Sequence, residues 1–235
     1  MRNVKRWIWR GLGACAALAF LYAAWVGAHV LYWTNHDPVT TAFMQARRAE
    51  WRADGRNVRI EMRWVPYERI SLHLKRAVVA AEDSKFLSHG GFDWAGIQEA
   101  MGKNLERGRV VAGGSTISQQ LAKNLFLSSE RTVWRKGQEA FITVVLEAML
   151  DKRRILEIYL NVIEWGEGIF GAEAAARHYF GTSAASLTPA QAARLAAMVP
   201  NPRYYHRHGV TAALERRAAI IRARMPLVRV PGNAE

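Results

Sequence analysis

Apolar residues recur at helical spacing along most of the chain from Pro66 onward, and glycine, proline and capping residues divide this pattern into segments. No convincing run of alternating apolar and polar positions indicates β-strands, and we find no internal repeat. This part of the chain is therefore predicted to be mostly α. The predicted helices cover residues 72–86, 92–105, 116–127, 133–150, 154–163, 172–178, 189–198 and 211–225.

A long apolar stretch precedes this helical part. Residues 11–33 hold no Lys, Arg, Asp or Glu, and a helix of this length spans a hydrocarbon core of about 30 Å. Trp25, Tyr32 and Trp33 suit an aromatic belt at the far interface. A cleavable signal peptide is the alternative, although its apolar region is usually only ~7–15 residues long. We therefore expect a retained transmembrane helix, with the basic residues 1–10 in the cytoplasm and the rest of the chain outside.

The charge of the chain indicates an anionic partner. The net charge is +13, and strongly basic proteins bind nucleic acid, anionic membrane surfaces or phosphorylated substrates. Of the 33 Lys and Arg residues, four precede the anchor, and the remaining 29 still outnumber the 20 acidic residues. The juxtamembrane segment 34–64 contains six arginines, and it either lies against lipid headgroups or presents a solvated helix face. The only cysteine, Cys15, falls in the predicted anchor, which excludes a disulfide and a cysteine-based site in the outer domain.

A first polar motif runs from Glu82 to His89. Glu82, Phe86 and His89 follow the spacing i, i+4 and i+7, so a continuous helix would place them on one face. Partial burial beside an aromatic ring would raise the pKa of the Glu82 carboxyl group and suit it to abstract a proton near neutral pH. A surface acid next to a core phenylalanine fits the same pattern, so this motif alone does not establish a base.

A second motif, residues 113–124, starts with two glycines and opens the next predicted helix. Thr116 and Gln119 match a capping box, and the start of a helix offers free N–H groups that bind anions. Gln120 and Lys123 lie three residues apart and so share one face. An ordinary capped helix explains Thr116 and Gln119 but not so many polar groups within one turn. The motif therefore predicts an anion-binding site.

Two further motifs follow along the chain. The third adds three cations to the anion-binding group: Arg131, Arg135 and Lys136. Arg135 can also pair with Glu139 at i, i+4, which is commonly a surface ion pair worth ~0.5 kcal/mol or less. The fourth motif, residues 155–181, combines core positions with Asn161, a candidate for supporting the site, and with several glycines.

All four motifs, in this order, resemble the peptidoglycan glycosyltransferase family, a module also found at the front of bifunctional penicillin-binding proteins. The resemblance covers about residues 65–205 and is most specific at 82–89 and 113–124. It implies a lysozyme-like α-helical glycosyltransferase domain over residues 65–210 with a small membrane-associated lobe, followed by a C-terminal helix and tail over 211–235. No Ser-x-x-Lys occurs, which excludes acyl-serine transpeptidase chemistry and indicates the monofunctional form.

The resemblance implies glycan-strand polymerisation from lipid II, in which the growing chain is transferred with inversion onto an acceptor 4-hydroxyl and undecaprenyl pyrophosphate is released. It makes Glu82 the catalytic base and Glu139 a second essential acid, and it implies a divalent cation, Mg²⁺, as cofactor. The substrate-binding residues implied in this way are Asp83, Phe86, His89, Gly114, Ser115, Thr116, Gln119, Gln120, Lys123, Asn124, Arg131, Arg135, Lys136 and Asn161.

The resemblance also implies a location and partners. We expect a single-pass protein of the bacterial inner membrane, with a cytoplasmic N-terminus and a periplasmic catalytic domain. The expected partners are lipid II, the nascent glycan chain and membrane lipids, with cell-division or cell-wall synthesis proteins as further candidates. Nucleic acid is not expected as a partner of an exported domain.

Other functions fit parts of the pattern. A lytic peptidoglycan-cleaving enzyme of lysozyme-like fold could use one glutamate but would not need the cationic cluster. A non-enzymatic cell-division scaffold would explain the anchor and the charge but not Glu82. Residues 166–171 also match the dinucleotide fingerprint G-x-G-x-x-G, but no acid occurs between residues 174 and 214, so we reject that site.

Overall fold

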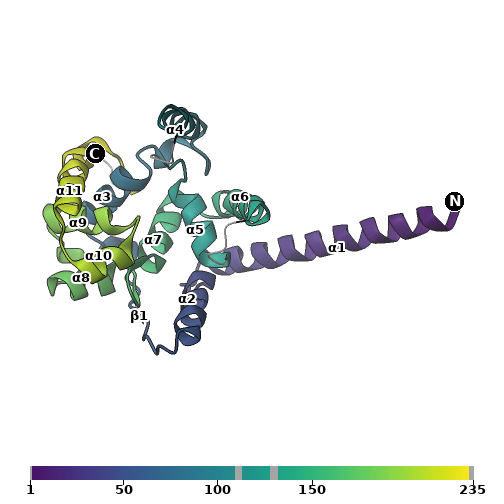
Figure 1. The fold of residues 1–235 in the computed structure, drawn as a ribbon, viewed down its shortest axis with the longest axis horizontal. Coiled ribbons are helices and arrows are strands. Elements are labelled where there is room, and N and C mark those ends of the chain that lie inside the picture. Colours follow the sequence, from purple (N-terminus) through teal and green to yellow (C-terminus); the bar gives the residue numbers. More distant parts are fainter. Residues whose placement is uncertain (1, 109–112, 128–131, 233–235) are drawn as a thin grey trace. The chain divides into compact units, whose positions relative to one another are not determined.

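The computed structural model describes residues 2–108, 113–127 and 132–232, and the chain divides into two compact units, residues 1–36 and 37–235 (Figure 1). The first unit is dominated by one long helix, α1 (Arg2–Tyr32). Within the described residues, its segment Lys5–Tyr32 is the only helix that is long and apolar enough to cross a membrane. This helix contains the predicted anchor, residues 11–33, except for its last residue, and some signal sequences are also long and apolar enough to meet this description.

The second unit is mostly α, as predicted, and the bounds of its helices follow the sequence pattern closely. The largest difference is at α3, which ends at Glu82 rather than at Phe86, and α10 was not predicted. Short 3₁₀ helices cover Tyr67–Arg69, Phe86–Ser88, Ala184–Ser186 and Met225–Leu227. The α-helices are α2 (Ala42–Ala53), α3 (Leu72–Glu82), α4 (Trp94–Glu106), α5 (Ile117–Phe126), α6 (Val133–Met149), α7 (Lys152–Val162), α8 (Ala172–Phe180), α9 (Pro189–Met198), α10 (Pro202–His208) and α11 (Ala212–Arg224).

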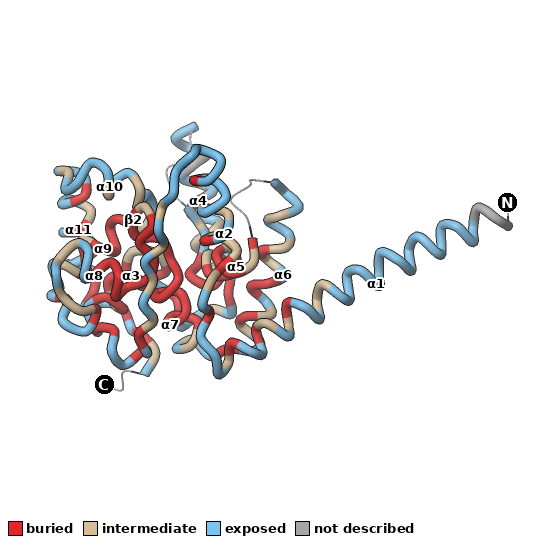
Figure 2. The backbone as a smooth tube through the Cα atoms, turned by 90° about the horizontal axis from the view of Figure 1, so that it is seen from below, coloured by how far each residue is buried: buried red, intermediate tan, exposed pale blue. Residues whose placement is uncertain are grey.

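The core of this unit runs along α7, which is buried over most of its length (Figure 2). Ile155, Leu156, Ile158 and Leu160 are fully buried, and burial of such side chains from water is the main stabilising contribution to folding. Helix α3 packs against α9 and α11, whereas α5 packs against α2, α6 and α7. The motif at the end of α3 and the motif at the start of α5 therefore belong to two different groups of packed helices.

The two flanking segments predicted from the sequence belong to the same compact unit as the residues between them. Helix α2 lies in the juxtamembrane segment 34–64, and it packs against α5. Helix α11 lies in the C-terminal segment 211–235, and it packs against α3 and α9. The compact unit 37–235 therefore includes both of these helices.

A small three-stranded sheet joins residues that are far apart in the sequence. Its strands are β1 (Glu61–Met62), β2 (Glu164–Gly166) and β3 (Ile169–Phe170), in the order β1-β3-β2. Strand β1 is parallel to β3, and β2 is antiparallel to it. The sequence did not reveal these strands, because strands of two or three residues are too short to show an alternating pattern.

Two glycines of the rejected dinucleotide fingerprint lie on either side of β3, one in the turn after β2 and one at the start of α8. Gly168 and Gly171 have φ angles of +77° and +81°, which only glycine adopts readily. A Cβ atom on Gly168 would lie 2.5 Å from the backbone oxygen of Arg59, and one on Gly171 would collide with the backbone oxygen of Asn161. Close backbone packing therefore explains this glycine pattern.

Gly171→Ala should destabilise the second unit much more than Gly181→Ala. Both positions have positive φ angles, but a Cβ on Gly181 meets nothing within 4 Å. We expect a loss of about 1–2 kcal/mol for Gly181→Ala from backbone strain alone. For Gly171→Ala we expect a loss of about 3 kcal/mol or more, because the new methyl group also displaces buried backbone. Urea unfolding of the detergent-solubilised protein, followed by circular dichroism, measures both values, and equal losses would contradict this account.

Candidate active site

Glu82 is the last residue of α3, and its side chain is 11% exposed. Its Oε2 accepts a hydrogen bond of 2.9 Å from Nε2 of Gln120 on α5. Its Oε1 lies 3.6 Å from Nη2 of Arg217 on α11. The carboxylate at the end of α3 therefore contacts two other helices, α5 and α11.

The surroundings of Glu82 favour a base that works near neutral pH. Burial raises the pKa of the Glu82 carboxyl group, and the charge of Asp83 acts in the same direction. The hydrogen bond from Gln120 and the charges of Arg217 and Lys123 lower this pKa, but the net shift is upward. A carboxylate with a raised pKa accepts a proton from a hydroxyl group more readily.

A buried tyrosine fixes the amide that holds Glu82. The hydroxyl group of Tyr159, on α7, donates a hydrogen bond of 2.7 Å to Oε1 of Gln120. Burial raises the pKa of this hydroxyl well above its usual range, so it stays protonated and acts as a donor. The amide nitrogen of Gln120 is then directed at Glu82. The fourth sequence motif includes Tyr159, but the sequence assigned it no role.

Asp83 ties the end of α3 to the start of α5. Its carboxylate accepts hydrogen bonds from Nε2 of His89 (2.9 Å) and from the backbone N–H of Ile117 (3.1 Å). The N–H of Gly91 donates to Nδ1 of His89 at 3.1 Å, which places the imidazole proton on Nε2. Asp83 and His89 therefore hold the backbone around Glu82, and their predicted contacts with substrate stay predictions.

The predicted shared helix face of Glu82, Phe86 and His89 was wrong. Helix α3 ends at Glu82 because Asp83 has φ −163° and ψ 74°, which is not helical. Phe86 lies in a 3₁₀ turn and is fully buried, with Nζ of Lys152 4.6 Å from its ring centroid. Phe86 thus contributes to the site through packing.

The capping box at the start of α5 is confirmed. The Thr116 hydroxyl accepts from the N–H of Gln119, and the Gln119 side chain accepts from the N–H of Thr116. Both residues are buried, and the Thr116 hydroxyl also donates to the backbone oxygen of Gly91 at 2.7 Å. These bonds fix the orientation of α5. Just before this helix, Gly114 and Ser115 line a cavity of about 210 Å³ together with Glu82.

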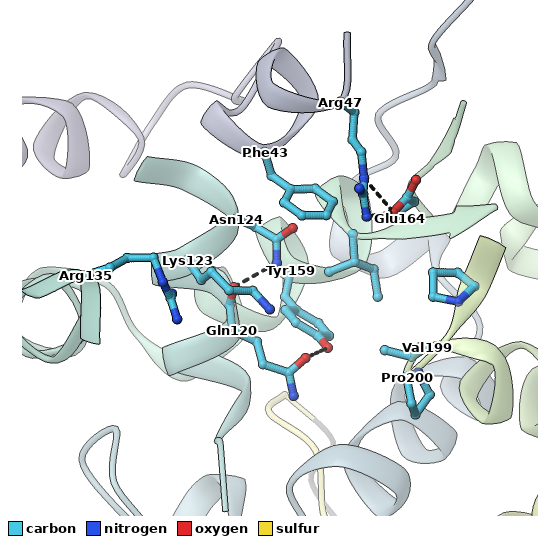
Figure 3. Close-up of a pocket in the computed structure, with 12 residues that line it drawn as sticks. Phe43, Arg47, Gln120, Lys123, Asn124, Arg135, Tyr159, Glu164, Val199 and Pro200 are labelled. Atoms are coloured by element: carbon cyan, nitrogen blue, oxygen red, sulfur yellow. Dashed lines mark hydrogen bonds and ion pairs between the residues drawn. The ribbon is translucent and has the colours of Figure 1, made fainter. Parts of the chain in front are cut away.

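A larger cavity of about 320 Å³ lies beside Gln120 (Figure 3). Lys123 and Arg135 give it two cations, and Nδ2 of Asn124 donates to the backbone oxygen of Gln120 at 2.8 Å. Gln120 lines this cavity and also bonds to Glu82, which lines the smaller one. We call the larger cavity the cationic cleft; it is lined by Phe43, Arg47, Gln120, Lys123, Asn124, Arg135, Tyr159, Ile163, Glu164, Val199, Pro200 and Pro202.

Glu139 is buried beneath two cations of the third motif. Its carboxylate pairs with Nη1 of Arg135 at 2.9 Å and with Nζ of Lys136. The predicted pair with Arg135 is confirmed, but a carboxylate that is only 4% exposed is not a surface acid. In this position Glu139 orients Arg135 at the cationic cleft, whereas Lys136 is half exposed. Arg131, the remaining predicted cation, lies outside the described residues.

Asn161 supports the fold rather than contacting substrate. It is fully buried. Its side chain exchanges two hydrogen bonds of 2.9 Å with the backbone of Val65, and it donates a third to the backbone oxygen of Glu157. Both polar atoms of the Asn161 amide have hydrogen-bond partners within the fold. The prediction that Asn161 contacts substrate is corrected accordingly.

Two arginines of α11 were missed by sequence reasoning. Arg217 lies beside Glu82, and Arg224 lines the same small cavity. No sequence motif surrounds either residue, so only the packing of α11 on α3 reveals their position. Helix α11 therefore places one cation beside the Glu82 carboxylate and a second in the smaller cavity.

Fold and site together define a class of protein: a mostly helical domain in which one largely buried carboxylate, Glu82, lies beside a cleft lined by cations. A family model described as transglycosylase matches residues 53–226. The chain belongs to the transglycosylase family.

Several relatives match this chain over nearly its whole length, and each is named biosynthetic peptidoglycan transglycosylase. The protein from Methylobacillus flagellatus is 59% identical over 97% of this chain and 100% of its own length. The protein from Laribacter hongkongensis is 59% identical over 96% and 99%. The protein from Thiobacillus denitrificans is 57% identical over 98% and 100%.

Arg217→Ala should move the acidic limb of the pH–activity profile to higher pH. A base must be ionised to act, and the charge of Arg217 lowers the pKa of Glu82. Removing that charge raises the pKa further, so activity should fall at acidic pH and persist at alkaline pH. The neighbouring exposed Arg216, changed to Ala, is the matched control. An unchanged limb in Arg217→Ala, measured as kcat/KM against pH, would show that Glu82 is not the titrating base.

Proposed function

We propose that this protein polymerises the glycan strands of peptidoglycan from lipid II and releases undecaprenyl pyrophosphate. The observation that supports this most directly is the hydrogen bond from Gln120 to Glu82, which joins the base to the cationic cleft. The names of the full-length relatives support the same substrate class.

The proposed reaction is a single displacement at an anomeric carbon. The acceptor 4-hydroxyl oxygen bonds to this carbon while its proton passes to the Glu82 carboxylate, and the bond from the carbon to the pyrophosphate oxygen breaks. One such displacement inverts the configuration and gives a β-linked strand. The leaving group departs as an anion, so it needs cations rather than a proton donor. In this proposal Lys123 and Arg135, which line the cationic cleft, stabilise the leaving group.

The carboxylates around Glu82 favour transfer over hydrolysis. A glycosidase uses two opposed carboxyl groups, one of which acts as an acid. The smaller cavity does contain Asp83 and Asp93. Asp83 is bonded to His89 and Ile117, however, and Asp93 accepts from the N–H of Gly96 at the start of α4. These bonds support a single base, which distinguishes the proposed function from that of a lytic enzyme.

The acidic residues of the site do not form a ready set of metal ligands. Glu139 is paired with Arg135 and Lys136, and the described residues contain no cluster of three or more His, Cys, Asp or Glu side chains placed to hold an ion. We therefore propose no step that depends on a protein-bound cation. The Mg²⁺ implied by the family resemblance stays a prediction, and activity measured with and without EDTA tests it.

We propose that the catalytic unit works against the outer face of the inner membrane, held there by α1. Helices α4 and α6 expose large apolar side chains, and α4 is exposed along much of its length (Figure 2). Exposed large apolar side chains of this kind suit contact with lipid. The side chains concerned are Trp94, Met101, Leu105, Val133, Trp134, Phe141 and Val144.

Glu82→Gln should lower polymerisation of purified lipid II by ~10²–10⁴-fold, because the amide cannot accept the acceptor's proton. Folding and binding of the lipid donor should be retained. Glu99→Gln, which changes an exposed acid on α4, should behave as wild type. Gel analysis of the products measures the loss. Turnover like that of the wild type by Glu82→Gln would exclude Glu82 as the base. Cleavage of finished glycan by the unaltered protein would favour the lytic alternative.

Lys123→Ala should lower kcat by ~10²–10³-fold, as expected for the loss of a group that stabilises developing negative charge. Lys103→Ala, on the exposed surface of α4, is the matched control and should leave kcat unchanged. Single-turnover measurements on lipid II separate this effect from product release. Equal rates for Lys123→Ala and Lys103→Ala would show that Lys123 does not stabilise the leaving group.

A further inference from the structure

One wall of the cationic cleft is formed by α2, almost all of which precedes the residues that match the family model. That match begins at residue 53, whereas α2 covers Ala42–Ala53. Phe43 and Arg47, one helical turn apart, both line the cleft (Figure 3). The cleft therefore includes side chains that the matched segment does not supply.

Helix α2 is fastened firmly enough to hold these side chains in place. The Thr41 side chain caps its first turn by accepting from the N–H of Met44 at 3.1 Å. Met44 and Trp51 are each only 1% exposed, and α2 packs against α5, the helix of Gln120 and Lys123. Because buried side chains fix the rotation of α2, the face with Phe43 and Arg47 is directed at the cleft.

The guanidinium of Arg47 is fixed by two carboxylates. Its Nε and Nη2 donate to Oε2 of Glu164 at 3.2 and 3.1 Å, and its Nη1 donates to Oε2 of Glu50 at 2.6 Å. Arg203 completes the network by donating to Oε1 of Glu50 at 2.9 Å. The guanidinium carbon also lies 4.6 Å from the centroid of the Phe43 ring. Such an ordered side chain loses little further freedom when a ligand binds.

Glu164 keeps hydrogen-bonding capacity on this wall. Its side chain is 4% exposed, and its Oε1 is buried without a hydrogen-bond partner among the described residues. An apolar lipid chain packed here would desolvate an ion pair and supply no hydrogen bonds, which costs free energy. A pyrophosphate would be attracted to Lys123 and Arg135, whose cations line the same cleft. The wall of the cleft that α2 forms instead combines the Phe43 ring with the ion pair between Arg47 and Glu164.

A sugar residue has the complementary chemistry, because its ring presents C–H faces and its edges present hydroxyl and amide groups. Pockets for such ligands combine aromatic side chains with a few placed polar groups. We propose that Phe43 and Arg47 of α2 bind a sugar residue of the lipid-linked glycan in the cationic cleft and thereby position it for transfer. This inference rests on the proposed function, and it makes the juxtamembrane helix a substrate-binding element.

The test compares a ligand that has the sugar with one that lacks it. Phe43→Leu and Arg47→Lys are made in full-length detergent-solubilised protein with Glu82→Gln, so that binding is measured without turnover. Each variant should weaken the binding of lipid II by roughly three- to tenfold, the range expected for an aromatic or paired contact. Binding of undecaprenyl pyrophosphate, which has no sugar, should stay unchanged.

Glu50→Gln serves as the structural control, because it breaks the outer part of the same ion network at a residue that does not line the cleft. It should leave both affinities unchanged. Equal weakening for the two ligands in Phe43→Leu would overturn the proposal, as would unchanged affinity for lipid II. If Glu50→Gln weakens the binding of lipid II as much as Arg47→Lys does, Arg47 supports the fold of the cleft and does not contact the sugar. Failure of the unaltered protein to bind lipid II would instead refute the proposed function.

Discussion

The hydrogen bond between Gln120 and Glu82 joins the end of α3 to the first turn of α5, and Tyr159 of α7 fixes the amide that makes it. A chain of two hydrogen bonds therefore links α7, α5 and the carboxylate at the end of α3. The packing of these helices removes water from Glu82, which raises the pKa of its carboxyl group. The Gln120 amide and Arg217 stabilise the ionised form. A general base needs both conditions, because a fully buried carboxylate without partners would stay protonated.

The charges of the site are divided between two adjoining cavities. The smaller one contains the Glu82 carboxylate, whereas the larger one contains Lys123 and Arg135, with Gln120 between them. Glu139 belongs to the second group although it is an acid, since it is buried against Arg135 and fixes that cation. Removing one partner of such a buried pair leaves an uncompensated charge, so the acid matters for the geometry of the cleft.

Local features were readable in the sequence wherever they depend on residues close together in the chain. The helical periodicity predicted a mostly α domain, the Thr116–Gln119 capping box marked the start of α5, and the long apolar run predicted α1. Glu82 and Lys123 were identified as candidates by their motifs. The bounds of α3 were less accurate, because one residue, Asp83, leaves helical geometry inside an otherwise helical pattern.

Tertiary structure alone decided which side chains surround Glu82. Gln120 and Tyr159 come from different helices, and Arg217 follows much later in the chain, so no sequence spacing relates them to the base. The strands of the small sheet escaped detection because their pairing, not their composition, defines them. The sequence by itself determined the helices, the anchor candidate and the kinds of chemical groups present. Long-range packing determined the pKa of the base, the partners of Glu139 and the walls of the cleft, because these depend on burial and distance.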